Sequence, residues 1–153
     1  MSDEHNDKAA RLAALDPATS FIVQAPAGSG KTELLIRRYL TLLARVEQPE
    51  EIVAITFTRK AANEMRARVT EALVLAGNES DPSDADPDPG KHLAKAVLSR
   101  DAEQGWELID NPGRMQIQTI DALSARLTRS LPLLSRFGVQ PETTADAREL
   151  YAE

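Results

Sequence analysis

Cysteine is absent from the 153-residue chain, and only two histidines are present, His5 and His92. The lack of thiols excludes a disulfide framework and a thiolate metal site, and two isolated imidazoles are too few for a zinc site or a catalytic triad. No apolar run approaches the ~20 residues of a membrane span. The N-terminus is acidic where a signal peptide is basic and then apolar. We therefore expect a soluble, cytoplasmic protein with no membrane partner.

Positive charge is also scarce, since 18 Lys and Arg stand against 24 Asp and Glu. The formal net charge of −6 is unevenly distributed, however. Residues 31–68 carry eight Lys and Arg against five acids, and residues 114–136 carry four Arg against one Asp, so each segment is at +3. These two segments are candidates to face a polyanion such as nucleic acid, and the acidic excess lies in tails and a linker.

Apolar periodicity predicts a strand, helix, strand, helix order in the first half of the chain. Ser20–Gln24 (SFIVQ) is typical of a short buried strand, as is the segment at 52–57 (IVAITF). The helix expected between them begins at Thr32 and has ended by Pro49, with Leu34, Leu35, Tyr39, Leu42, Leu43 and Val46 on its apolar face. The helix expected after the second strand places Ala61, Ala62, Met65, Val69, Ala72, Leu73 and Ala76 on one face. This order is typical of a parallel sheet covered by helices.

The second half begins with a segment that cannot build a core. Residues 77–90 (GNESDPSDADPDPG) hold three Pro, two Gly and five acids, so we expect a flexible linker. A helix is predicted over 91–102, and the alternation at Met115–Thr119 (MQIQT) predicts a third strand. The helix expected to follow it carries an apolar face and ends near Ser130, because Pro132 interrupts it; that face is formed by Leu123, Leu127, Leu131 and Leu134.

A Gly-rich stretch, VQAPAGSGKTELL, joins the first predicted strand to the first predicted helix. It meets the pattern G-x-x-x-x-G-K-[ST] from Ala25 to Thr32, with alanine at the first glycine position. Gly28 and Gly30 permit positive φ, so backbone N–H groups can point at phosphate oxygens. Lys31 would bridge the β and γ phosphates, and the Thr32 hydroxyl would ligate Mg²⁺. The predicted nucleotide site is Ala25, Pro26, Ala27, Gly28, Ser29, Gly30, Lys31 and Thr32, with Lys31 and Thr32 as its catalytic pair.

A second polar stretch, AITFTRKAANEMRARV, begins at the carboxyl end of the second strand, the edge where ligands bind in open α/β sheets. Thr56, Thr58 and Arg59 can contact a phosphodiester backbone there. Phe57 can either stack on a base or belong to the core. The arginines of the following helix, Arg66 and Arg68, fit DNA contact or a solvated helix face equally.

Together, APAGSGKT and TFTRKAANEM resemble motifs I and Ia of the UvrD/RecB superfamily 1 helicases. RMQIQTIDALSARLTR resembles the next motif, and its Thr-Ile-Asp form with Asp121 is most similar to AddA and RecB-like helicases. The resemblance implies a P-loop NTPase of the α/β class, with an incomplete RecA-like parallel sheet flanked by helices. It implies Mg²⁺ and ATP as cofactors, single- and double-stranded DNA as partners, 3′ to 5′ translocation in repair or recombination, and a nuclease partner of the kind found in AddAB/RecBCD-like complexes. The DNA-contacting residues would be Thr56, Phe57, Thr58, Arg59, Thr119 and Arg126.

Three departures from the family pattern qualify this resemblance. Many relatives read adenine with a glutamine upstream of the phosphate loop, but DKAARLAALD has none, which leaves Arg11 or backbone groups as substitutes. ATP hydrolysis needs an apolar strand closing in Asp-Glu. WELID is the nearest match, although Asp110 fits a surface loop better, with Trp106 as a packing anchor. The second RecA-like domain is missing, so we expect an N-terminal piece of a helicase.

The expected organisation is an N-terminal segment (1–19), an ATP-binding core (20–76), a linker (77–90), a helix, strand and helix (91–138) and the start of a helical insertion (139–153). The leading hypothesis is the ATP-binding portion of a DNA helicase. Two alternatives stay open, a truncated, non-catalytic nucleotide- and DNA-binding protein and a small P-loop kinase. Whether the chain itself is an enzyme is left undecided.

Overall fold

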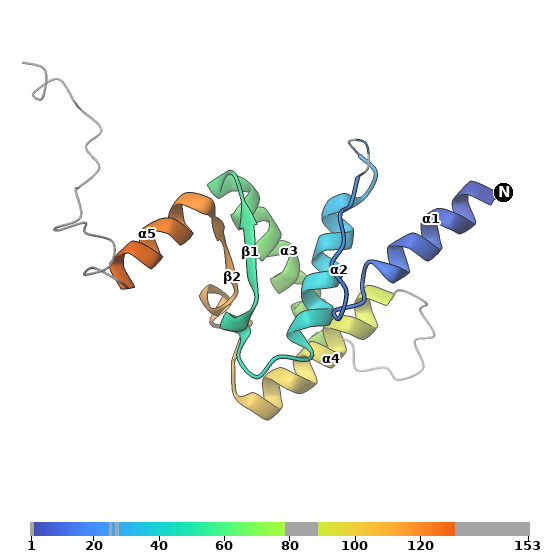
Figure 1. Cartoon of the computed structure of the whole chain (residues 1–153). Coiled ribbons are helices and arrows are strands. Elements are labelled where there is room, and N and C mark those ends of the chain that lie inside the picture. Colours follow the sequence, from blue (N-terminus) through green and yellow to red (C-terminus); the bar gives the residue numbers. More distant parts are fainter. Residues whose placement is uncertain (1, 25, 27, 79–88, 131–153) are drawn as a thin grey trace, which may run out of the picture. The chain divides into compact units, whose positions relative to one another are not determined.

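A computed structural model describes residues 2–24, 26, 28–78 and 89–130. Two strands and five α-helices lie within these ranges, along with short 3-10 helices at Pro49–Glu51 and Pro112–Arg114. In chain order the elements in Figure 1 are α1 (Ser2–Ala13), α2 (Lys31–Leu43), β1 (Val53–Thr56), α3 (Arg59–Asn78), α4 (Pro89–Gln104), β2 (Gln116–Thr119) and α5 (Ile120–Ser130). The protein is therefore of the mixed α/β class.

The sheet consists of β1 and β2, which run parallel. Val53 lies beside Gln116 at one end of the register, and Thr56 lies beside Thr119 at the other. Both strands were predicted from the sequence, within one or two residues at each end. Their carboxyl ends, Thr56 and Thr119, lie at the same edge of the sheet.

The first predicted strand, Ser20–Gln24, does not form. This segment has no regular secondary structure, and Ile22 within it is 99% exposed. A parallel strand needs a neighbour for its backbone hydrogen bonds, and within the described ranges β1 and β2 pair only with each other. The prediction of a buried first strand at Ser20–Gln24 was therefore wrong.

One face of the sheet packs against the helices. Ala54 and Ile117 point into the core, while Val53 and Ile55 on the opposite face are about half exposed. The helix α3 lies along the buried face, and α4 packs against both α3 and α2 (Figure 1). The core is formed by Ile36, Tyr39, Leu40, Leu43, Ile52, Ala62, Val69, Leu73, Ala76, Ala94, Val97, Trp106, Leu108, Met115 and Ile117.

The predicted helix face is confirmed for α3 except at Ala61, which is exposed, and is partly wrong for α2. Leu35 was assigned to the apolar face of α2 but is 51% exposed, and Ile36 and Leu40, which were not assigned to it, are buried. The true face is turned toward α3 and α4, which cover a different stripe of the helix. In α3, the side chain of Arg66 also donates to the backbone carbonyl of Ile117, which fastens the helix to β2.

The predicted linker at 77–90 is shorter than expected, because α3 continues to Asn78 and α4 begins at Pro89. A proline suits the first turn of a helix, where its missing N–H has no intrahelical partner to lose. The linker residues 79–88 lie outside the described residues. So do Leu131, Leu134 and the predicted insertion at 139–153, and α5 is described as far as Ser130.

Side chains join the segment that precedes β1 to the segment that precedes β2. Arg114 donates to Glu50 at 2.8 Å and to the side chain of Gln48 at 3.0 Å, and this ion pair lowers the pKa of Glu50. Trp106 is 1% exposed and donates its indole N–H to the carbonyl of Glu47 at 3.1 Å. The expected role of Trp106 as a packing anchor is confirmed.

Candidate functional site

The phosphate-loop sequence forms a turn that leads directly into α2. Gly28 has φ of 77° and Gly30 has φ of 79°, as predicted for backbone that must fold back on itself. Gly30 is the N-cap of α2, so the first turn of the helix points its backbone N–H groups back toward the loop. The positive end of the helix dipole lies at the same place. This backbone can cradle an anion.

The two residues with predicted chemical roles open α2. Lys31 is half-buried, and its Nζ donates to the carbonyl of Pro26 across the loop. Thr32 is exposed in the first turn of the helix. Ala25 and Ala27, also assigned to the nucleotide site, lie outside the described residues. Lys31 and Thr32 are therefore adjacent residues at the start of α2, directly after the loop.

A cavity of about 380 Å³ adjoins the loop. Its walls come from α1, from residues 21–24 and from the start of α2, and most of its lining is apolar. The lining includes Arg11, Phe21, Ser29, Lys31 and Leu34. Predicted nucleotide-binding residues therefore share a cavity that has room for a ligand beside the loop.

Two arginines hold the N-terminal segment against this region. Arg11 of α1 donates from Nη2 to the carbonyl of Ser29 at 2.7 Å. Arg38 of α2 donates to the carbonyls of Ala14 and Thr19 at 2.6 and 2.9 Å, and its guanidinium lies 5.5 Å from the ring centroid of Phe21. Neither contact was predicted in this form, because the hydrogen-bonded partners are 18 or more residues apart in the sequence.

The predicted DNA-contacting residues gather where the strands end. Thr56 and Thr119 are neighbours in the register of β1 and β2, and Thr119 is buried. Phe57 follows β1 and is 87% exposed, so the alternative that it belongs to the core is wrong. Thr58 and Arg59 are exposed next to it. This edge thus presents an aromatic ring, hydroxyls and a cation in one short segment.

The hydroxyl of Thr58 already has one structural task. Its Oγ1 accepts the backbone N–H of Ala61 at 3.1 Å and so caps the amino end of α3. A threonine directly before a helical segment is a recognised N-cap signal, and this role could have been predicted from the sequence. Any ligand contact by Thr58 would use the remaining hydroxyl proton.

Arg126, the last predicted DNA-contacting residue, lies on α5. This helix belongs to a separate compact unit that begins at Ile120, while the residues up to Thr119 form the other unit. Arg126 is half-buried and has an interaction partner. The structure brings Thr56, Phe57, Thr58, Arg59 and Thr119 together, and Arg126 is described by itself.

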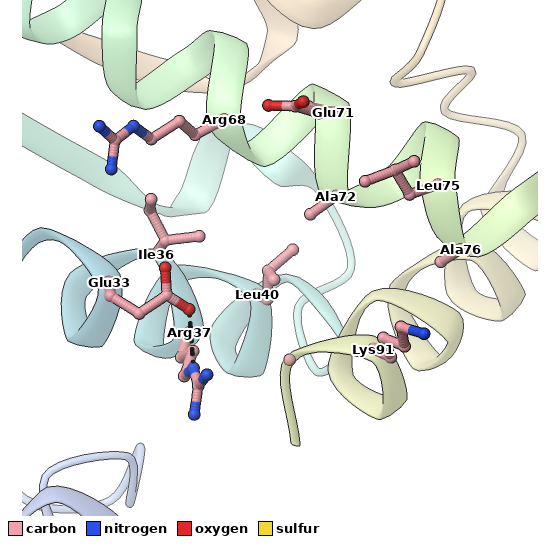
Figure 2. Close-up of a pocket in the computed structure, with 11 residues that line it drawn as sticks. Glu33, Ile36, Arg37, Leu40, Arg68, Glu71, Ala72, Leu75, Ala76 and Lys91 are labelled. Carbon is pink, nitrogen blue, oxygen red and sulfur yellow. Dashed lines mark hydrogen bonds and ion pairs between the residues drawn. The ribbon is translucent and has the colours of Figure 1, made fainter. Parts of the chain in front are cut away.

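A second hollow lies between α2, α3 and the start of α4 and has a volume of about 400 Å³. Figure 2 shows Ile36 and Leu40 of α2 facing α3 across it, with Glu33 and Arg37 paired at 2.8 Å. Its floor is apolar, and of the residues considered for nucleotide or DNA contact only Arg68 contributes to its described lining. We therefore do not assign it to the candidate site.

Within the described ranges, no cluster of three or more metal-ligating side chains (His, Asp or Glu) occurs. β1 ends in Thr56 and β2 ends in Thr119, so neither described strand closes in a carboxylate. Asp110 is exposed, as expected for a surface loop. In the same ranges, no helix is long and apolar enough to cross a membrane.

These features describe a mixed α/β protein in which a Gly-rich, lysine-bearing loop opens a helix and polar side chains follow two parallel strands. The chain belongs to the UvrD/REP helicase family, because the model of the UvrD/REP helicase N-terminal domain matches residues 6–147. The resemblance drawn from the three motifs is thereby confirmed.

Curated relatives carry helicase names. DNA helicase II of Escherichia coli is 45% identical over 75 residues, which are 48% of this chain and 10% of the relative. An ATP-dependent helicase/nuclease subunit of Thermoanaerobacter sp. is 44% identical over 59 residues, or 37% of this chain and 5% of the relative. The same kind of subunit from Streptococcus thermophilus is 28% identical over 144 residues, which cover 88% of this chain and 10% of the relative. The chain thus spans about a tenth or less of these relatives. No solved structure matches it.

Proposed function

We propose that the chain is the ATP-binding portion of an ATP-dependent 3′ to 5′ DNA helicase that acts in DNA repair or recombination. The observation that carries this proposal is the loop turn at Gly28 and Gly30, which opens α2 with Lys31 and Thr32 in a chain of the UvrD/REP family. Under this proposal the fold is the start of a RecA-like P-loop domain. Its remaining strands would pair at the free edges of the two-stranded sheet.

The loop would hold the triphosphate through backbone N–H groups and the ammonium of Lys31. In the present structure that ammonium contacts the carbonyl of Pro26, so phosphate oxygens would replace a loop carbonyl as its partner. Thr32 supplies a hydroxyl oxygen, the ligand type that Mg²⁺ prefers. With one protein oxygen at this position, the ion would depend mainly on phosphate oxygens and water. Mg²⁺ would supply charge neutralisation between the phosphates.

Single-stranded DNA would lie across the carboxyl edge of the sheet. Phe57 is exposed enough to stack on a base, and Arg59 and Thr58 adjoin it at the amino end of α3, where phosphate oxygens are favoured. Arg126 of α5 is also proposed to contact DNA. A partner subunit with nuclease activity is proposed because relatives are named as subunits of a helicase/nuclease.

The nucleotide half of the proposal is tested by isothermal titration of Mg·ATP into the 153-residue chain and its Lys31→Ala variant. Loss of a charge-assisted contact to phosphate should weaken binding at least about tenfold. The matched control is Lys60→Ala, which removes an exposed lysine from α3 and should bind Mg·ATP as the wild type does. Equal affinities for the wild type and Lys31→Ala would contradict the loop assignment.

The DNA half is tested by fluorescence anisotropy with a labelled single-stranded oligonucleotide. Removing a stacking ring costs about 1–3 kcal/mol per base, so Phe57→Ala should weaken binding by roughly 5- to 150-fold. Leu75→Ala, which truncates an exposed apolar side chain in the last turn of α3, is the control. Identical DNA affinities for the two variants would refute the role of Phe57.

A second function is favoured by one observation. Because both described strands end in threonine, no carboxylate is in place there to hold the metal and orient water. The 153-residue chain would then bind nucleotide and DNA without hydrolysing ATP. A DNA-stimulated ATPase assay decides between the two functions, since turnover by this chain that Lys31→Ala abolishes would exclude the non-catalytic one.

A further inference from the structure

We propose that Arg11 is a positioning residue for the phosphate loop, which fixes the orientation of the Ser29–Gly30 peptide so that the loop is prepared for a triphosphate. The inference rests on the proposed function of the loop and goes beyond it, because it assigns a role to a side chain of α1 that lies outside the loop sequence. Arg11 would act on the phosphates through this peptide and not by touching them.

The guanidinium of Arg11 is held at two points. Its Nη2 donates to the carbonyl of Ser29 at 2.7 Å, and its Nε donates to Asp7 Oδ2 at 2.8 Å. Asp7 and Arg11 are four residues apart on α1 and therefore lie on the same side of the helix. Charge-assisted hydrogen bonds of this kind are stronger than neutral ones, and the planar guanidinium keeps them in a fixed geometry.

Fixing the carbonyl of Ser29 also fixes the N–H of Gly30. The two groups belong to one peptide, which is planar and trans, so the N–H points opposite to the C=O. With the oxygen held toward Arg11, the Gly30 N–H is directed away from α1. In phosphate loops it is such backbone N–H groups that face the phosphate oxygens. A peptide free to flip would instead present a carbonyl oxygen to the anion, which repels it.

Gly30 gives a second, independent sign of close approach. A Cβ atom at this position would lie 3.2 Å from Nη1 of Arg11, whereas one at Gly28 would meet nothing within 4 Å. Both glycines have positive φ, but only Gly30 has the guanidinium packed against it. Arg11 therefore contacts the Ser29–Gly30 peptide both through its carbonyl and at the Cα that follows.

The same contacts argue against the other role considered from the sequence, in which Arg11 recognises adenine in place of the usual glutamine. Its Nε and Nη2 are engaged by Asp7 and Ser29, and the carboxylate of Asp7 offsets most of its charge at long range. A guanidinium held at these two points is directed at the loop peptide, and positioning through that peptide does not depend on the base. The effect of Arg11 should therefore be the same for any ligand that carries a triphosphate.

The test compares three probes by isothermal titration into the 153-residue chain, namely Mg·ATP, Mg·GTP and inorganic tripolyphosphate. Arg11→Ala should weaken all three by the same factor, about tenfold, as expected for loss of one charge-assisted hydrogen bond. Arg11→Lys keeps a donor and should recover part of the loss, and Asp7→Asn should give a smaller loss. Lys8→Ala removes an exposed positive charge one turn earlier on α1 and should change none of the affinities more than about twofold.

The outcomes separate this inference from the proposed function. If Lys31→Ala binds tripolyphosphate as tightly as the wild type, the loop assignment itself is wrong. If Lys31→Ala loses binding while Arg11→Ala retains it, only the role of Arg11 is overturned. A loss confined to Mg·ATP would make Arg11 a base-reading residue, which also overturns the inference.

A purely structural role for Arg11 predicts a different result. It would lower the melting temperature and leave the tripolyphosphate affinity of the folded chain unchanged. The positioning role requires that Arg11→Lys weakens tripolyphosphate binding and shifts the amide resonance of Gly30 in a ¹⁵N-labelled sample, even when its melting temperature is unchanged. Should Arg11→Ala fail to fold, Arg11→Lys decides the question by the same two readouts, resonance shift and tripolyphosphate affinity. An unshifted resonance with wild-type affinity would exclude the proposal.

Discussion

Replacing Gly30 by alanine would put a methyl group on backbone that has φ of 79°. For an L-residue this left-handed conformation costs roughly 1–2 kcal/mol, because Cβ comes too close to the following carbonyl oxygen. The added Cβ would also lie 3.2 Å from Nη1 of Arg11, so the guanidinium must move by a few tenths of an ångström. Both effects disfavour the loop conformation that leads into α2.

The strain predicts a loss of binding affinity. If the ligand must restore the native loop, the roughly 1–2 kcal/mol is subtracted from its binding free energy, which corresponds to about 5- to 30-fold weaker binding. Gly28→Ala, at φ of 77° with open space around it, should suffer the φ strain alone. Gly30→Ala should therefore bind tripolyphosphate more weakly than Gly28→Ala.

The assay is titration of tripolyphosphate into the wild type and three alanine variants. Gly113→Ala is the control, because Gly113 has neither a positive φ nor a neighbour within 4 Å of a built Cβ. A urea denaturation series on the same variants checks that each chain is folded. The reasoning is refuted if Gly28→Ala and Gly30→Ala bind tripolyphosphate as tightly as Gly113→Ala.

Three further predictions concern stability. Trp106→Phe should lower the unfolding free energy by about 2–3 kcal/mol, because it leaves a cavity and an unpaired Glu47 carbonyl; urea unfolding followed by circular dichroism would reveal a loss near zero if the packing role is wrong. Glu107 has φ of 57°, so Glu107→Gly should raise the free energy of unfolding by about 1 kcal/mol. An equal increase for Glu107→Ala would count against backbone strain as the cause. The pKa of Glu50 is lowered in the folded protein by Arg114, so its stabilisation is present above the ordinary value of 4.5 and is lost as the pH falls through the folded pKa. Glu50→Gln should therefore flatten the acid limb of a stability profile measured from about pH 6 downward, and an unchanged limb would contradict this.

Local chemistry was the predictable part of the fold. The turn at Gly28 and Gly30 follows from the need for positive φ. The strand at 53–56 follows from a short apolar run, and the strand at 116–119 follows from the alternation of apolar and polar residues. The buried face of α3 could be predicted because its apolar residues recur at the helical period along the whole helix. The candidate DNA-contacting residues of the first unit also clustered as predicted, since parallel strands end at one edge of a sheet.

Features that depend on distant partners could not be predicted. Ser20–Gln24 has the composition of a strand, but a strand exists only where another backbone lies beside it. The burial of Ile36 in place of Leu35 depends on which side of α2 meets α3 and α4. The contact of Arg114 with Glu50 joins residues 64 apart, and nothing in either local sequence identifies the other.

The hydrogen bonds of Arg11 and Arg38, which join the N-terminal segment to the loop and to α2, bear on how easily α1 detaches. The core cluster takes no member from α1 among the described residues, so this helix is held mainly by polar contacts at its carboxyl end. Such an element can detach without unfolding the sheet, as a cooperative unit of low local stability. Its amide hydrogens should exchange with solvent faster than those of α3. An anion bound at the loop would favour the docked helix by linkage. Slower amide exchange within α1 would then indicate that the loop has bound an anion.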